Sequence, residues 1–216
     1  KTFTMKGNEN SQGLIPMKLL LLIVLLLSFN AHSIENKTFP IGMDRFVDYE
    51  IQDGWKVFKK NLPAKLGAEA IKIITDHGDE IQGLFMVVKH DNPALITAGS
   101  PEKFIEMLHA AVSRSYSENS VEGFQPPRLI TINDSLRLES TFTDKSFLSH
   151  KKFGQLNGSS EQYKYATLIT YFIGPQETGV AASIVLLSNE LSGSNHDATI
   201  ATINSFATIN SFAMKQ

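Results

Sequence analysis

The alternation of apolar and polar positions predicts a β-hairpin in the first half of the chain. Residues 69–75 are rich in β-branched side chains, and residues 80–89 alternate in the manner of a strand. One face of the second segment is apolar: Leu84, Met86 and Val88. The polar stretch over residues 76–79 is typical of a turn, so the two segments are expected to pair as antiparallel strands.

The clearest predicted helix follows Ser100. Serine is a favoured N-cap, and Pro101 would occupy the first helical position, where its missing N–H costs nothing. Side chains at helical spacing then share the face that is expected to meet the core: Phe104, Leu108, Ala111, Val112 and Ser115. This placement leaves His109 on the polar side as a surface histidine. The helix is expected to end near Ser117.

Strand patterns return in the second half of the chain. Residues 129–133 predict one strand, and residues 136–143 alternate like a strand with one buried face. Residues 163–173 and 180–187 are apolar on both faces, which is typical of central strands covered from both sides.

A final helix is expected from about Ala198, with Asn195 or Asp197 as its cap. The resulting order of strands, helix, strands and helix predicts an α+β protein, in which helices flank an antiparallel sheet. The expected boundaries are a flexible lead-in over residues 34–45, one domain over 46–212 and a tail over 213–216.

The last helix contains a duplication, because residues 201–206 recur as residues 207–212. Six helical residues turn by about 600°, so the two copies face different directions and cannot both pack into one groove. The favoured interpretation is a duplication whose outer copy frays. The alternative is that Ile209 and Phe212 form an apolar surface for a partner.

Residues 17–33 have the pattern of a secretory signal peptide. A lysine precedes Leu19–Leu27, nine aliphatic residues in a row, and Ala31 and Ser33 supply small side chains at a cleavage site. The run is shorter than the roughly 20 residues of a bilayer span. A buried core helix and an uncleaved anchor are the alternatives.

We therefore expect cleavage after Ser33, no membrane span in the mature chain, and a location in the periplasm or the medium. Residues 1–16 are polar and are expected to be a disordered upstream extension.

Composition narrows the classes of function. A net charge of −2 argues against a dedicated nucleic-acid binder, which normally carries a basic excess. The chain has no cysteine, which excludes disulfides, cysteine-ligated zinc, iron–sulfur clusters and thiol catalysis. Dinucleotide, phosphate-loop and zinc-protease motifs are missing as well, so no cofactor is expected.

Few residues form a recognisable catalytic pattern. His77, Asp79 and Glu80 could hold a metal weakly, but a solvated turn is the favoured interpretation because ligand clusters usually show tighter spacing. Two Ser-x-x-Lys matches lack the Lys-Thr-Gly partner of a serine acyl-enzyme. The remaining catalytic alternative is a hydrolase whose carboxylates converge only in the fold, for example Asp79, Glu80 and Glu139.

Aromatic side chains are the main candidates for a binding surface. Three tyrosines between residues 163 and 171 would share one strand face and could line a groove, although core packing under a helix is the favoured interpretation. The basic cluster His150-Lys151-Lys152 is interpreted as a solvated loop. The candidate ligand or partner surface comprises Trp55, Tyr163, Tyr165, Tyr171, Ile209 and Phe212.

Several short features occur in a familiar order: Gly54-Trp55, a pair of strands, a helix after Ser100-Pro101, and two long strands before a helix that ends Ile203-Asn-Ser-Phe206. This order, over about residues 47–212, resembles the PsbP-like superfamily, which includes the photosystem II subunit PsbP, Ran-binding Mog-type proteins and exported bacterial proteins of the DcrB type. The duplicated ending departs from the usual pattern. The resemblance implies an α/β/α sandwich without a shared catalytic residue.

The leading expectation is an exported, non-enzymatic binding or accessory domain that recognises a protein or small ligand outside the cytoplasm. The alternatives are the hydrolase described above and an effector- or immunity-type protein that acts through an interface. Fold analogy alone does not decide between them.

Overall fold

The computed structural model describes residues 34–42, 45–60, 62, 68–89, 91–132, 135–145, 163–173 and 178–206. The chain divides after Ser33 into two units, and every described residue belongs to the second, Ile34–Gln216. The expected signal peptide, the basic cluster at 150–152, Ile209 and Phe212 lie outside the described residues. No helix in the described ranges has the length and apolar character needed to cross a membrane.

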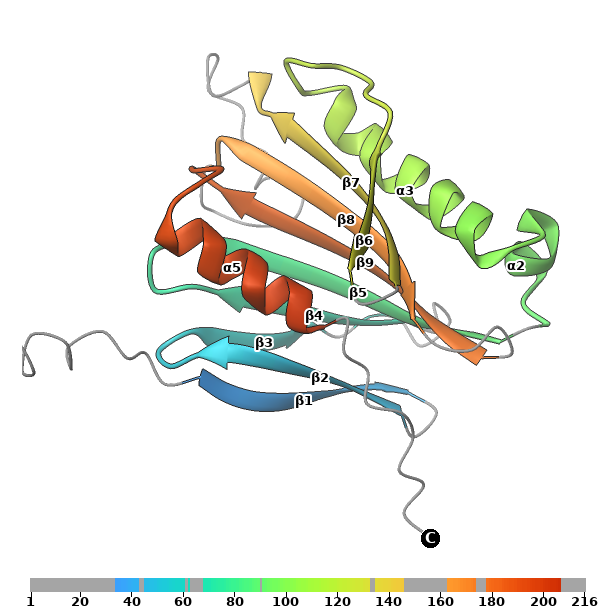
Figure 1. The fold of residues 1–216 in the computed structure, drawn as a ribbon, viewed down its shortest axis with the longest axis horizontal. Coiled ribbons are helices and arrows are strands. Elements are labelled where there is room, and N and C mark those ends of the chain that lie inside the picture. Colours follow the sequence, from blue (N-terminus) through green and yellow to red (C-terminus); the bar gives the residue numbers. More distant parts are fainter. Residues whose placement is uncertain are drawn as a thin grey trace, which may run out of the picture. The chain divides into compact units, whose positions relative to one another are not determined.

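Strands and helices among the described residues form an α+β fold, which confirms the predicted class (Figure 1). The strands are β1 Ile34–Gly42, β2 Arg45–Gln52, β3 Lys56–Lys60, β4 Ala68–Ile74, β5 Glu80–Lys89, β6 Arg128–Ile132, β7 Ser135–Thr143, β8 Tyr165–Ile173 and β9 Thr178–Ser188. The helices are α2 Pro93–Ala98, α3 Pro101–Ser117 and α5 Ser194–Ser205.

Seven strands form one antiparallel sheet in the order β3-β4-β5-β9-β8-β7-β6. The hairpin predicted from residues 69–75 and 80–89 is confirmed as β4 and β5, with Ala68 opposite Met86 and Ile74 opposite Glu80. The sheet consists of two runs of strands that are consecutive in the chain, β3–β5 and β6–β9. The runs join where β9 pairs with the whole length of β5. β1 and β2 form a separate two-stranded sheet.

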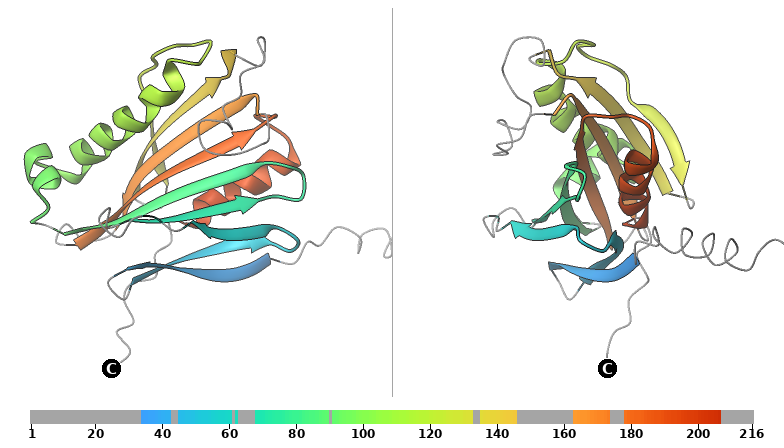
Figure 2. Two further views of the ribbon diagram at one scale, coloured as in Figure 1. Left: turned by 180° about the vertical axis from the view of Figure 1, so that it is seen from behind. Right: turned by 90° about the vertical axis from the view of Figure 1, so that its left-hand side faces the viewer.

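Different elements cover the two faces of the seven-stranded sheet (Figure 2). On the face that we call the α5 face, α5 and the β1–β2 hairpin pack over buried side chains that include Ile73, Ile81, Phe85, Ile169 and Ile184. On the other side, the α3 face, α2 and α3 cover a core that includes Val88, Phe142, Ala166, Leu168 and Ala181. β8 and β9 therefore bury both of their faces, as their sequences predict.

The expectation of a flexible lead-in over residues 34–45 is wrong for most of that segment. Ile34–Gly42 forms β1, which pairs with β2 and buries Phe39 and Ile41. Only two large apolar side chains of this strand face the core, and Pro40 stands between them, so the sequence signal is weak. Proline is tolerated here because β1 has a strand partner on one side only.

The buried face of α3 is displaced by about one residue from the predicted face. The structure buries Phe104, Ile105, His109, Ser113 and Tyr116. His109 is therefore a core residue, at 1% exposure, and its assignment to the surface is wrong. Its ring nitrogens lie 2.9 Å from Ser140 Oγ and 3.0 Å from Thr170 Oγ1, so the sheet beneath supplies the polar partners that make burial of a histidine tolerable.

The helices differ from the prediction in two further respects. α5 begins at Ser194, earlier than expected, and its N-cap is Gly193, which provides no side-chain bond. The pattern did not reveal α2, a short helix whose first N–H groups bind the Asn92 side chain and which ends at Gly99 with φ of 82°.

Candidate functional site

The tight turn between β4 and β5 presents the most concentrated group of polar side chains. The Thr75 N–H donates to the Asp79 carbonyl oxygen at 3.0 Å, and the Asp79 N–H donates to Thr75 Oγ1 at 2.8 Å. Gly78 has a φ of 95°, a conformation that other residues rarely adopt. This geometry directs His77 toward α5.

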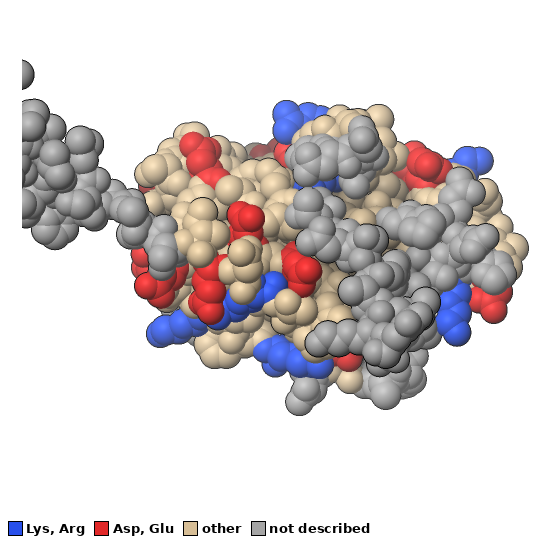
Figure 3. Space-filling view, turned by 60° about the horizontal axis from the view of Figure 1, so that its bottom comes forward, with Lys and Arg blue, Asp and Glu red and all other residues tan. Residues whose placement is uncertain are grey.

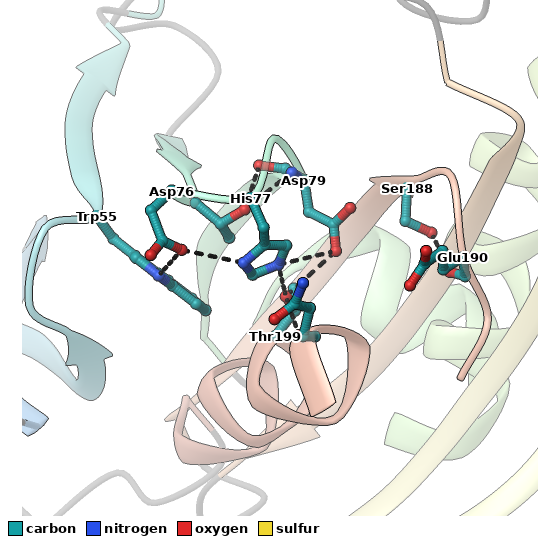
Figure 4. Close-up of polar contacts among 9 residues, drawn as sticks. Trp55, Asp76, His77, Asp79, Ser188, Glu190 and Thr199 are labelled. Carbon is teal, nitrogen blue, oxygen red and sulfur yellow. Dashed lines mark hydrogen bonds and ion pairs between the residues drawn. The ribbon is translucent and has the colours of Figure 1, made fainter. Parts of the chain in front are cut away.

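The His77 imidazole lies between two carboxylates (Figure 4). Nδ1 is 3.0 Å from Asp76 Oδ1, and Nε2 is 3.3 Å from Asp79 Oδ2 and 3.1 Å from Thr199 Oγ1. Trp55 Nε1 donates to the same oxygen of Asp76 at 3.1 Å, and its ring meets the imidazole edge-on. We call these five residues the His77 cluster.

The pKa values of the two carboxylates in the cluster, Asp76 and Asp79, shift in opposite directions. Burial raises the pKa of Asp79, and the charge of His77 and the hydrogen bond from Thr199 only partly oppose that shift. Burial acts on Asp76 in the same direction, but hydrogen bonds from His77 and Trp55 outweigh it and lower the pKa of Asp76. The more exposed carboxylate therefore holds negative charge more readily than the buried one.

A hydroxyl, an imidazole and a carboxylate in sequence are the groups of a catalytic triad. Here the hydroxyl belongs to Thr199, which is fully buried within α5 and whose Oγ1 also lies 3.0 Å from the Asn195 carbonyl oxygen. A substrate carbonyl has no access to this atom. The cluster instead connects three parts of the fold: Trp55 before β3, the β4–β5 turn and α5. Ser188, which Figure 4 also shows, donates to the Glu190 backbone carbonyl oxygen and is not part of the His77 cluster.

The three carboxylates proposed to converge in the fold remain apart. Asp79 belongs to the His77 cluster, whereas Glu80 lies on the α3 face, 2.7 Å from Lys72 Nζ. Glu139 is on β7, three strand spacings from β5 or about 14 Å, and pairs with Arg128. Within the described ranges, no three His, Asp or Glu side chains are arranged to hold a metal ion.

The aromatic candidates are dispersed as well. Tyr163 is buried in the core of the α3 face, whereas Tyr171 is buried in the core of the α5 face. Trp55 is also buried, so these three side chains pack in the interior. Tyr165 is partly exposed, with Lys164 Nζ 5.0 Å from its ring centre. The tyrosines therefore do not line a common groove.

A different surface carries exposed apolar side chains. On the α3 side of β3, β4 and β5, Phe58 is 47% exposed and Leu84 is 36% exposed. Phe58 lies opposite Lys72, which lies opposite Gln82, so all three point to the same side. α3 packs mainly on β7 and β8, and α2 and α3 cover β5 only at Met86 and Val88. The rest of this side, over β3, β4 and β5 as far as Leu84, has no described helix above it (Figure 2). We call this surface the open sheet face.

The open sheet face carries positive charge at its edges. Lys56 and Lys60 flank Phe58 along β3 and are exposed. Lys72 reaches across to the buried carboxylate of Glu80, which also accepts hydrogen bonds from Gln82 and Tyr163. Because Glu80 holds Lys72 at 2.7 Å and offsets its charge, the lysines that a partner would mainly meet here are Lys56 and Lys60.

The opposite side of the molecule does not carry mainly positive charge. The outward-facing strands β1 and β2 carry Glu35, Lys37, Asp48 and Glu50, and Figure 3 shows acidic and basic side chains interspersed on this side. Lys37 and Glu35 form an exposed ion pair at 2.9 Å. Phe46 of β2 is also exposed, at 53%, but it shares its strand face with Asp48 and Glu50, whereas the open sheet face combines an exposed aromatic side chain with lysines.

Comparisons of this chain with protein-family models, with curated proteins and with solved structures found no match.

Proposed function

We propose that this protein is an exported, non-enzymatic binding or accessory domain whose open sheet face binds a protein segment with acidic and apolar residues. The observation that carries the proposal is the combination of exposed Phe58 and Leu84 with three lysines on one sheet surface. Partly exposed apolar side chains in a flat patch supply binding energy, and the lysines select acidic partners.

The geometry of the polar groups supports a binding role over catalysis. The side chains that most resemble a catalytic set belong to the His77 cluster, where the hydroxyl is buried and both ring nitrogens already face partners. Export is supported by the signal-peptide pattern over residues 17–33. The order of elements that resembles PsbP-like proteins, most of which act by binding, is in keeping with the binding part of the proposal.

The export half of the proposal predicts a defined mature end. When the full chain is expressed in a bacterium, the periplasmic fraction is expected to contain a product that begins at Ile34. A Leu22→Arg, Leu25→Arg double variant is expected to remain uncleaved in the cytoplasm, because two charges interrupt the apolar run. N-terminal sequencing of both fractions provides the measurement. A cytoplasmic wild-type product that still contains residues 19–27 would contradict export.

The binding half predicts that Phe58 is the main contact. A displayed library of random peptides selected on the purified domain is expected to yield sequences that mix acidic and apolar residues. Phe58→Ser is expected to weaken their binding about tenfold or more, because aromatic side chains at the centre of an interface dominate its energy. Isothermal titration calorimetry with the selected peptides measures the effect.

The matched control for that measurement is Leu191→Ser, which removes an apolar side chain of 45% exposure outside the open sheet face. It is expected to leave peptide binding unchanged. Equal binding by wild type and Phe58→Ser, with both proteins folded, would show that the open sheet face is not the binding surface.

A further inference from the structure

A buried arginine on the α5 face lacks most of its hydrogen-bond partners. Arg137, on β7, is 1% exposed, and its Nη1 donates to Asn204 Oδ1 of α5 at 2.7 Å. Its Nε and Nη2 have no hydrogen-bond partner among the residues that the structure describes. The alternation of residues 136–143 predicted that this side of β7 would face solvent; burial of Arg137 shows that both sides of the strand are covered at this point.

A second unpartnered donor lies beside this guanidinium. Tyr171, directly opposite Arg137 on β8, is fully buried, and its hydroxyl has no hydrogen-bond partner in the described part of the chain. The guanidinium carbon lies 4.9 Å from the centre of the Tyr171 ring, which is a cation–π arrangement. Glu139 on the same strand is engaged by Arg128 at 3.1 Å.

In the ranges that the structure describes, the buried guanidinium lacks acceptors for two of its nitrogens, although Glu139 lies near enough to act on its charge. Burial lowers the pKa of Arg137, while the nearby Tyr171 and Glu139 act against that shift, so the group remains a buried cation. An arginine charge without a hydrogen-bonded partner is unfavourable in a protein interior. A cation–π contact and one amide bond satisfy only part of the guanidinium, and its Nε–Nη2 edge is buried without a hydrogen-bond partner among the described residues.

We propose that this edge binds a small carboxylate. The N–H groups of Nε and Nη2 point in the same direction within one plane, at the spacing that matches the two oxygens of a carboxylate. The Tyr171 ring covers a face of the guanidinium, so a planar ligand approaching in the guanidinium plane fits better than a tetrahedral one. The site is on the α5 face, and the inference does not depend on the open sheet face.

Formate is the simplest probe. Thermal unfolding of the desalted protein is measured in increasing sodium formate, with sodium chloride and sodium phosphate at equal ionic strength as the comparisons. The melting temperature of the wild type is expected to rise by roughly 4 °C at ten times the dissociation constant of formate. The rise with chloride or phosphate is expected to be smaller.

Two variants make the test specific. Arg137→Lys keeps the charge but has no paired N–H edge, and it is expected to lose the formate-dependent rise. Arg128→Lys, which changes an exposed arginine already paired with Glu139, is expected to retain it. Tyr171→Phe keeps the ring and removes only the hydroxyl, so it provides a second test if Arg137→Lys fails to fold; its formate-dependent rise is expected to be reduced.

A direct measurement completes the experiment. The ¹H–¹⁵N resonance of Arg137 Nε, identified by its loss in Arg137→Lys, is expected to move as formate is added. Equal responses of wild type and Arg137→Lys, or an unmoved Nε resonance, would overturn the proposal. A stronger response to phosphate or chloride than to formate would overturn the assignment to carboxylates.

Discussion

Replacing Phe206 by alanine is expected to lower the free energy of unfolding by about 4 kcal/mol, the usual cost of removing a fully buried phenylalanine. Phe206 lies at the end of α5 and is 0% exposed. Its ring stacks on that of Tyr49 of β2, with the ring centres 4.8 Å apart, and packs against the ring of Phe85 of β5, with the centres 5.4 Å apart. One side chain therefore joins the last helix, the β1–β2 hairpin and the main sheet.

The size of this effect is large relative to the stability of a domain, which is usually about 5–15 kcal/mol. Urea unfolding followed by the fluorescence of Trp55, the single tryptophan and a buried one, measures it directly. Phe124→Ala is the matched control, because Phe124 is 77% exposed and its removal should change stability by less than about 0.5 kcal/mol. Similar losses in the two variants would show that Phe206 does not connect these elements.

Acid is expected to destabilise the protein through His109. Burial lowers the pKa of this imidazole to about 4, from an ordinary value of 6.5. Between these values the unfolded chain binds a proton that the folded protein rejects, so stability is complete above pH 6.5 and falls as the pH decreases toward 4. The full loss from this group is about 3 kcal/mol, since each unit of pKa corresponds to roughly 1.4 kcal/mol.

The contacts of His109 explain why only the neutral ring fits. The Ser140 and Thr170 hydroxyls face its two nitrogens, and a neutral ring can donate to one hydroxyl and accept from the other. Urea unfolding of wild type and His109→Gln at pH 7.0, 5.5 and 4.5 tests this, because glutamine keeps a donor and an acceptor but does not titrate. The difference in stability between the two proteins should shift in favour of the variant as the pH decreases. Parallel pH profiles would rule out His109 as the source.

The sequence predicted the elements well where their pattern is local. The spacing of apolar residues located β4, β5, α3, β8 and β9 to within about two residues, because burial on a strand or helix face imposes a period that a single segment displays. β1 was missed because two inward-facing side chains give too short a pattern to recognise. α2 was missed because six residues are also too few to show a helical period.

The polar sites could not be predicted in the same way, because their members are distant in the chain. His77 meets Thr199 across 122 positions, and Arg137 meets Asn204 across 67. Neither pair has a fixed spacing that would mark it in a sequence. The local clue that did exist was the Asp76-His77-Gly78-Asp79 turn, which identified a polar loop but not the helix that packs against it.

His109 shows a second limit of periodicity. The predicted face of α3 followed the apolar side chains, whereas the actual face includes His109, which meets hydroxyl groups of β7 and β8, and Ser113, whose hydroxyl donates to the Ala110 carbonyl oxygen of the same helix. Polar residues become suitable for burial only when the opposing surface offers partners, and that surface is known only once the sheet is formed.

The pairing of β5 with β9 has a consequence for the order of events during synthesis. β9 is a central strand, yet it is the last strand to emerge, and without it β3–β5 and β6–β8 have no common partner. Contacts between such distant segments slow the search for the native state. A nascent chain therefore cannot complete this sheet until β9, which ends at Ser188, has left the ribosome, so the two runs of strands remain separate for most of synthesis.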